Sequence, residues 1–136
     1  MKICIFGESC VGKSTLAAAL RQRTGAKIYT GKDYLRLAKN ENEAKELFRK
    51  LLAQEDNLVY VTTEPEGLSL LPENCLRILM TEELDIIKER FSKRTGGHLP
   101  PPVAQMLERN HGIFDDIPCD LHFHGGNWDI DSILQR

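Results

Sequence analysis

The sequence predicts an α/β domain of three layers, in which helices cover both faces of a parallel sheet. Short apolar runs rich in β-branched residues alternate with segments of helical period, and a glycine-rich loop separates the first run from the first helix. The 136 residues contain no internal repeat, low-complexity tract or linker, so we expect a single domain over residues 1–136. The expected strands cover residues 2–6, 27–30, 57–62, 75–80 and 120–124.

Each of the remaining segments has end signals typical of a helix. The first is rich in alanine and stops at Gly25, a residue suited to a left-handed C-cap. Asn40 is expected to cap the second through a capping box, Thr81 the third, and Asn127 the last. The expected helices cover residues 13–23 and 41–53, a segment that starts after Thr81, and residues 102–109 and 128–134.

Composition excludes several classes of function. Lys and Arg number 18 against 20 Asp and Glu, and no lysine-rich run supports general binding to nucleic acid. No apolar run approaches the roughly 18 residues that a membrane span needs. The four cysteines include no CxxC pair and are too sparse for a disulfide framework, so we expect a cytoplasmic protein.

A phosphate-binding loop follows the first expected strand. Residues 7–15 read GESCVGKST, a full match to the Walker A pattern GxxxxGK[ST] in the expected context of strand, loop and helix. Its glycines allow the backbone to wrap around a polyphosphate, while Lys13 reaches the β- and γ-phosphates and Ser14 ligates Mg²⁺. The sequence therefore predicts ATP and Mg²⁺ as cofactors, bound by Gly7, Glu8, Ser9, Cys10, Val11, Gly12, Lys13, Ser14 and Thr15.

A second segment, at residues 30–36, reads TGKDYLR. It is similar to the TGDxLR stretch with which nucleotide kinases hold their acceptor, although a lysine precedes the acid. With the phosphate loop, it makes the chain resemble the small P-loop kinases: shikimate kinase, gluconate kinase and the nucleoside monophosphate kinases. This resemblance implies the strand order 2-3-1-4-5. It also implies that Asp33 orients the acceptor hydroxyl or serves the metal, while a capping role for Asp33 in a short helix remains the alternative.

Residues 88–109 resemble the lid of such kinases. Five basic residues against two acidic ones give this segment a net charge of +3 in a chain whose total is -2. Arg90 and Arg94 lie one helical turn apart, so both can face the phosphates, and we expect them to act in catalysis beside Lys13 and Asp33. Leu99 stands where gluconate kinases have an aromatic residue, so specificity for a sugar acid is not implied.

The segment after the third strand departs from these families. Residues 62–67 read TTEPEG, without the glycine triplet of shikimate kinases or the arginine of the DGFPR-type turn. Glu64 can orient the waters of a magnesium ion, or it is a solvent-facing turn residue. The acidic edge favours a neutral or cationic acceptor. His122 and His124 alternate on one strand, which fits either a metal pair or a structural role.

The leading hypothesis is therefore an ATP-dependent phosphotransferase acting on a hydroxyl of a small molecule. The alternative is a regulatory or interaction module that binds a nucleotide with weak or no kinase activity. We expect a monomer or homodimer, with neither nucleic acid nor membrane as a partner. In so short a chain only residues 30–53 and the lid remain to build the acceptor pocket, which should be small, shallow or completed by another subunit.

Overall fold

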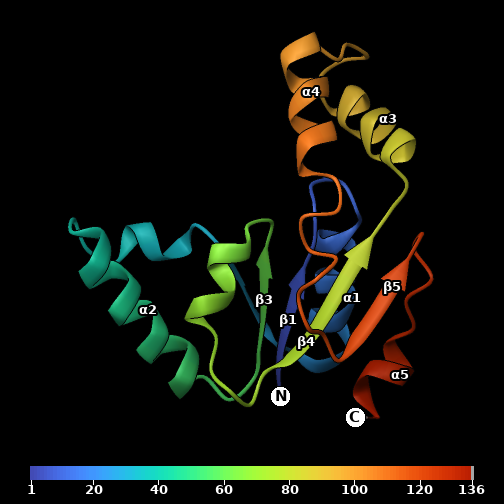
Figure 1. Ribbon diagram of the computed structural model, residues 1–136. Helices are drawn as coiled ribbons and strands as arrows, with labels where there is room; N and C mark the ends of the chain where they lie inside the picture. The colour runs from blue at the N-terminus through green and yellow to red at the C-terminus, as the bar shows by residue number, and fades with distance from the viewer. Residues whose placement is uncertain (136) are drawn as a thin grey trace.

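Five parallel strands form one sheet in the order β2-β3-β1-β4-β5, as predicted (Figure 1). The computed structural model describes residues 1–135. Two expected strands have the predicted bounds, and the other three differ by one residue at one or both ends. The strands are β1 (Lys2–Phe6), β2 (Lys27–Thr30), β3 (Leu58–Thr62), β4 (Leu76–Thr81) and β5 (Leu121–His124).

The helices also follow the predicted order, but two of the expected caps are wrong. Asn40 caps α2 by accepting a hydrogen bond from Glu43 N, and Gly25 is a left-handed C-cap with φ 73°, as expected. Thr81 instead completes β4, and Asp129 rather than Asn127 caps the last helix. The helices are α1 (Lys13–Thr24), α2 (Glu41–Gln54), α3 (Leu84–Arg94), α4 (Pro101–Asn110) and α5 (Ile130–Leu134), with 3-10 turns η1 (Asp33–Arg36) and η2 (Pro65–Leu70).

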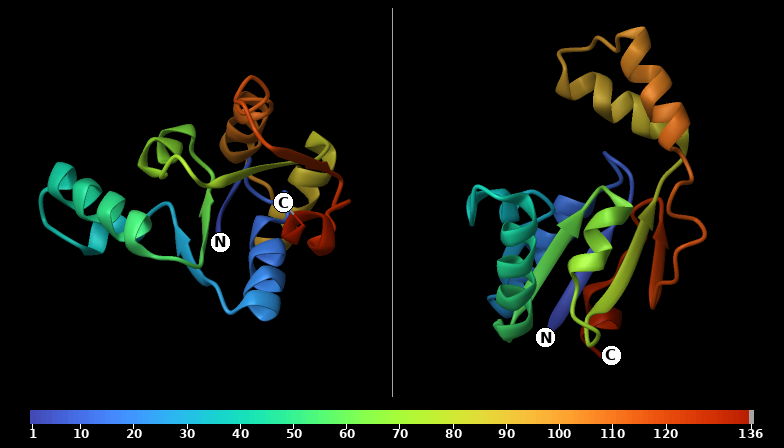
Figure 2. Two further views of the ribbon diagram at one scale, coloured as in Figure 1. Left: turned by 90° about the horizontal axis from the view of Figure 1, so that it is seen from below. Right: turned by 60° about the vertical axis from the view of Figure 1, so that its left-hand side comes forward.

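The alternation of side chains along β1 divides the interior into two cores. Ile3 and Ile5 face a core shared with α1 and α5, whereas Cys4 and Phe6 face a core shared with α2 and η2. The view from below in Figure 2 shows α1 and α5 on one face of the sheet and η2 on the other. This is the three-layer α/β/α arrangement that the sequence predicts.

Helices α3 and α4 stand beyond the carboxyl ends of the strands (Figures 1 and 2). They pack on each other and are joined by an ion pair of 2.6 Å between Lys88 Nζ and Glu108 Oε1. Each contributes one buried residue, Ile87 and Leu107 respectively, so the pair has little core of its own. Within residues 1–135 no helix is both long enough and apolar enough to span a membrane.

Candidate functional site

The loop between β1 and α1 lies at the carboxyl edge of the sheet. Gly7 has no room for a side chain, because a Cβ there would clash with the backbone carbonyl oxygen of Met80. Cys10 and Gly12 have positive φ angles of 64° and 98°, which turn the loop back toward the first residue of α1, Lys13. Such a loop presents successive N–H groups and a helix N-terminus to an anion. The conformation therefore suits the phosphate binding that the sequence predicts.

Lys13 is the buried cation of this loop. Its side chain is 6% exposed, and Nζ donates a hydrogen bond to the backbone carbonyl oxygen of Glu8. Burial, together with a smaller effect of the nearby Arg94 guanidinium, lowers the pKa of the Lys13 ammonium from 10.5 to about 8. The charged form of the amine is thus disfavoured beside the loop, and a bound anion would stabilise it.

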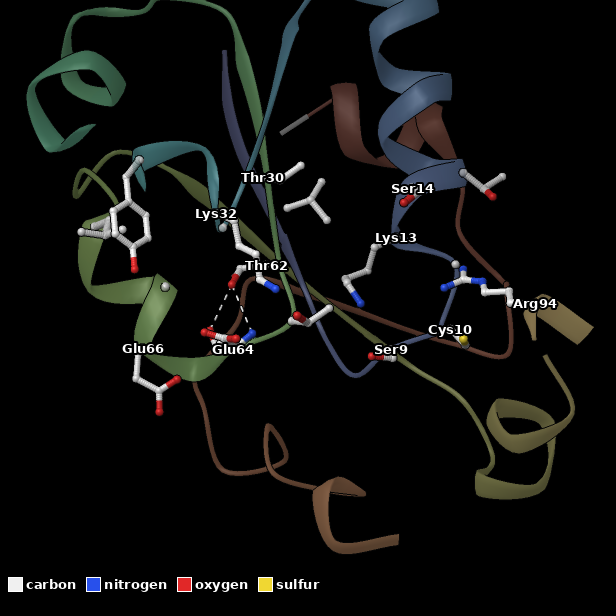
Figure 3. A pocket seen from close by; sticks show the side chains of 18 of the residues that line it. Ser9, Cys10, Lys13, Ser14, Thr30, Lys32, Thr62, Glu64, Glu66 and Arg94 are labelled. Atoms are coloured by element: carbon white, nitrogen blue, oxygen red, sulfur yellow. Dashed lines mark hydrogen bonds between the residues drawn. The ribbon is translucent and has the colours of Figure 1, made fainter. Parts of the chain in front are cut away.

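A cavity of about 320 Å³ opens in front of this loop (Figure 3). Lys13, Ser14 and Thr15 line one side of it, and Arg94 of α3 borders it as well. The opposite side comes from the segment after β2 and the turn after β3. Volumes of 300–1,000 Å³ are typical of small-molecule sites. The segments that the sequence singled out therefore meet around one cavity.

Both charge signs occur on the far wall of the cavity. Lys32 extends its amine into the same space as Lys13 (Figure 3), and Lys45 of α2 also lines the cavity. Glu64 and Glu66 belong to the lining too, although the Glu66 carboxylate points away from Lys13 (Figure 3). The acidic edge expected from the sequence is therefore balanced by two lysines. Lys45 was not found by sequence analysis, because its place on the cavity depends on how α2 packs.

Asp33 is placed beside the cavity but does not line it. Its Oδ2 accepts a hydrogen bond of 2.7 Å from Thr30 N, which holds the turn that leads into η1. The alternative of a capping role is wrong, because Asp33 is the first residue of η1, Lys32 stands at the N-cap position, and no side chain caps this helix. Of the two residues expected to serve the metal, Ser14 faces the cavity and Asp33 does not.

No group of three or more His, Cys, Asp or Glu within residues 1–135 is arranged to hold a metal ion. Mg²⁺ seldom needs such a cage, because it keeps several waters and takes oxygens from the substrate phosphates. The Ser14 hydroxyl, with Glu64 across the cavity, is a donor set of the hard oxygen type that this ion prefers. These residues therefore fit a magnesium ion that arrives with a nucleotide.

The two arginines predicted to be catalytic have different surroundings. Arg94 lines the cavity. Arg90 instead braces the phosphate loop: Nη1 donates to the Cys10 carbonyl oxygen at 2.9 Å, and Nη2 lies 3.4 Å from the carboxylate of Glu82. Glu82 is only 5% exposed. The pairing of Glu82 with Arg90 was not predicted from the sequence.

The histidines near the carboxyl end of β5 form a hydrogen-bonded cluster. Thr81 Oγ1 lies 2.7 Å from His122 Nε2 and 2.8 Å from His124 Nδ1, and His124 Nε2 lies 3.1 Å from a carboxylate oxygen of Glu83. These contacts tie β4 to β5. The structural role left open for His122 and His124 is thus the one that the contacts support.

A parallel sheet of this order, with a glycine-rich phosphate loop after its central strand, defines the P-loop class of α/β domains. No protein-family model matches the chain, and no curated protein matches its sequence. Solved structures do match. The chain has the fold of the small P-loop kinases of the shikimate and gluconate kinase group.

Three such structures illustrate the similarity. Shikimate kinase from Acinetobacter baumannii, in complex with shikimate, matches with a TM-score of 0.68 and 13% identity over 98% of this chain and 88% of that chain. A gluconokinase from Sinorhizobium meliloti has a TM-score of 0.61 and 15% identity, over 98% and 87%. The YorR protein of Bacillus subtilis, in complex with phosphorylated GDP, has a TM-score of 0.64 and 22% identity, over 98% and 92%.

Proposed function

We propose that the protein is an ATP-dependent kinase that transfers the γ-phosphate to a hydroxyl group of a small molecule. The observation that carries this proposal is the single cavity shared by the phosphate loop, Arg94 and the segments after β2 and β3. In this proposal the polyphosphate lies against the loop and the acceptor against the segments after β2 and β3, which line the same cavity. The fold similarity to shikimate kinase and gluconokinase supports the same reaction class.

In the proposed reaction the loop and Lys13 hold the β- and γ-phosphates, and Ser14 contributes its hydroxyl to a magnesium ion. When bound, Mg²⁺ neutralises charge on the β- and γ-phosphate oxygens. Arg94 neutralises the charge that develops on the transferring phosphoryl group, a kind of contribution that reaches about 10³ or more in rate. Arg90 acts on the same reaction indirectly, because it fixes the Cys10 carbonyl and hence the shape of the loop.

The acceptor hydroxyl has to lose its proton as it attacks, and a carboxylate is the usual group that orients it. We assign this role to Glu64, because it lines the cavity while the Asp33 carboxylate is engaged by Thr30 N. The role predicted for Asp33 would require its side chain to move, because it does not line the cavity. Lys32 and Lys45 favour an acceptor that carries an anionic group beside its hydroxyls, which revises the neutral or cationic acceptor expected from sequence.

A screen of ATP consumption against polyols, sugar acids, nucleosides, aminoglycosides and small hydroxy acids tests the proposal. We expect one compound class to stimulate turnover well above the rate with ATP alone. A protein that binds Mg-ATP tightly, but whose ATP consumption no compound stimulates, would instead be a nucleotide-binding module. The observation that favours this second candidate is the engaged Asp33, together with the missing glycine triplet. A cytoplasmic location and a monomeric or homodimeric state remain predictions.

A further inference from the structure

The phosphate loop is hydrogen-bonded both to α3 and to the segment directly after α4. Within α3, Arg90 donates a hydrogen bond to the backbone carbonyl of Cys10. The segment directly after α4 bonds to the side chain of Glu8. These contacts join residues 80 to 104 positions apart in the sequence. Two loop residues, Glu8 and Cys10, thus bond to a helix pair that contributes only two buried side chains.

The Glu8 attachment uses both carboxylate oxygens. Oε1 lies 3.0 Å from His111 Nδ1, and Oε2 accepts a hydrogen bond of 3.0 Å from Gly112 N. The Glu8 side chain is 8% exposed, so these partners compensate a carboxylate that is nearly removed from water. A buried carboxylate costs stability unless it is paired. A negative charge also disfavours the binding of phosphate nearby. We therefore look for a role of Glu8 other than packing.

The same residue also contacts the buried lysine. The backbone carbonyl of Glu8 accepts the hydrogen bond from Lys13 Nζ. Residue 8 is thus linked through its side chain to the end of α4 and through its backbone to the amine that faces the γ-phosphate site. Cys10, two residues on, has a left-handed φ of 64°, which is costly for a residue other than glycine, and its carbonyl is held by Arg90.

We infer that Glu8 and His111 are positioning residues that couple the shape of the phosphate loop to the placement of α3 and α4. This inference rests on the proposed function, because it takes the loop to be the nucleotide site. A shift of the helix pair would alter the contacts of the Glu8 side chain with His111 and Gly112. The Glu8 backbone, and with it the hydrogen bond to the Lys13 amine, would then move as well. Nucleotide binding, in turn, selects one placement of the helix pair, since coupling between two sites is reciprocal. Arg94 belongs to the same helix pair, so the same contact would also set its position at the cavity.

Substitutions at the exposed partner give the sharpest test. His111→Ala removes the Nδ1 donor at a side chain that is 37% exposed, so the fold should tolerate it. His111→Asn keeps a donor near the same position and should restore function. His124→Ala is the matched control, because His124 also pairs with a glutamate, at 3.1 Å, without contacting the phosphate loop. Glu8→Gln removes one of the two acceptor oxygens and completes a double-mutant cycle with His111→Ala.

Two readouts are needed: the affinity for Mg-ATP, and hydrogen exchange of residues 98–112 with and without nucleotide. We expect His111→Ala and Glu8→Gln each to weaken Mg-ATP binding about tenfold, the size of one lost charge-assisted hydrogen bond, with the double variant no worse than either single variant. Nucleotide-induced protection of residues 98–112 should be lost in both and kept in His124→Ala. KM for ATP should rise more than kcat falls.

The outcomes separate this inference from the proposed function. If the wild type binds Mg-ATP but the variants bind it equally well, with unchanged protection, the coupling is absent while the proposed function stands. If the two variants lose affinity additively and His111→Asn restores nothing, the contact is structural only, and the inference is overturned. If the wild type binds no nucleotide, the proposed function fails and takes this inference with it.

Discussion

Lys13 is the residue whose chemistry the structure defines most closely. Its amine is buried, donates to the Glu8 carbonyl and has a pKa lowered to about 8. Because the unfolded value is 10.5, folding disfavours the charged form, so this group adds stability as the pH rises from about 8 to 10.5. Bound phosphates act in the opposite direction, since they favour the ammonium form.

We therefore expect nucleotide binding to take up a proton at and above about pH 8. The affinity for Mg-ATP should fall as the pH rises from 8 to 9.5, by up to about tenfold per unit. Calorimetric titrations in buffers of different ionisation enthalpy measure both effects. Lys13→Met should bind weakly and without this pH dependence. A wild-type affinity that stays flat to pH 9.5 would show that Lys13 does not hold the phosphates.

Glu64 and Asp33 provide a second test at the level of single residues. Glu64→Gln should lower kcat about a hundredfold or more, because the cavity loses the carboxylate proposed to orient the acceptor. Asp33→Asn should have a small effect, since the amide oxygen can still accept the hydrogen bond from Thr30 N. Steady-state kinetics of both variants, with stability checked by thermal unfolding, measures the difference. The reverse ranking would return the acceptor role to Asp33.

The candidate site was predictable only where its residues are close together in the sequence. The phosphate loop is a contiguous pattern, so its residues could be read directly, and Arg94 followed from a helical spacing. The partners that shape the loop could not be found in this way, because His111 is 103 positions from Glu8 and the Glu82 pairing depends on where α3 starts. Single charged residues in a helix or turn give no signal of a distant partner.

At the level of the elements, the N-terminal boundary of α2 is set by a capping residue next to it in the sequence. Asn40 Oδ1 accepts a hydrogen bond of 3.0 Å from Glu43 N and satisfies one of the free amides at the start of the helix. Asn40→Ala should lower the free energy of unfolding by about 1 kcal/mol, as measured by urea denaturation. Asn42→Ala, in the first turn of the same helix, is the control. An equal loss in both variants would mean that the cap contributes nothing specific.

The strands and helices themselves were predictable, but the transitions between them were less so. Thr81 has the side chain of a cap, yet it pairs with His124 in the β4–β5 ladder, because extending the sheet satisfies more backbone groups than a single capping bond. Likewise Asp129, two residues beyond the expected Asn127, caps α5 through Asp131 N. Where several polar residues lie close together in the sequence, their preference for the N-cap position does not show which of them caps the helix.

For the whole molecule, the contrast between the sheet and the helix pair has functional meaning. Two cores hold the sheet from both sides, with Ile5, Leu16, Phe48 and Tyr60 essentially removed from solvent. Helices α3 and α4, by comparison, contribute only Ile87 and Leu107 as buried side chains, and hydrogen bonds join Arg90 and the segment after α4 to the phosphate loop. Elements with few apolar contacts open at low free energy, as a lid has to do. We therefore predict that α3 and α4 act as a mobile lid over a phosphate loop whose own conformation stays fixed.

Transfer of the γ-phosphate at the phosphate loop can be followed directly with a labelled phosphate. The protein is incubated with γ-labelled ATP, Mg²⁺ and the compound class that stimulates turnover, and the products are separated. We expect a labelled acceptor with the wild type and at least about a hundredfold less with Lys13→Ala. Label found only in free phosphate, or equal labelling by the Lys13→Ala protein, would contradict it.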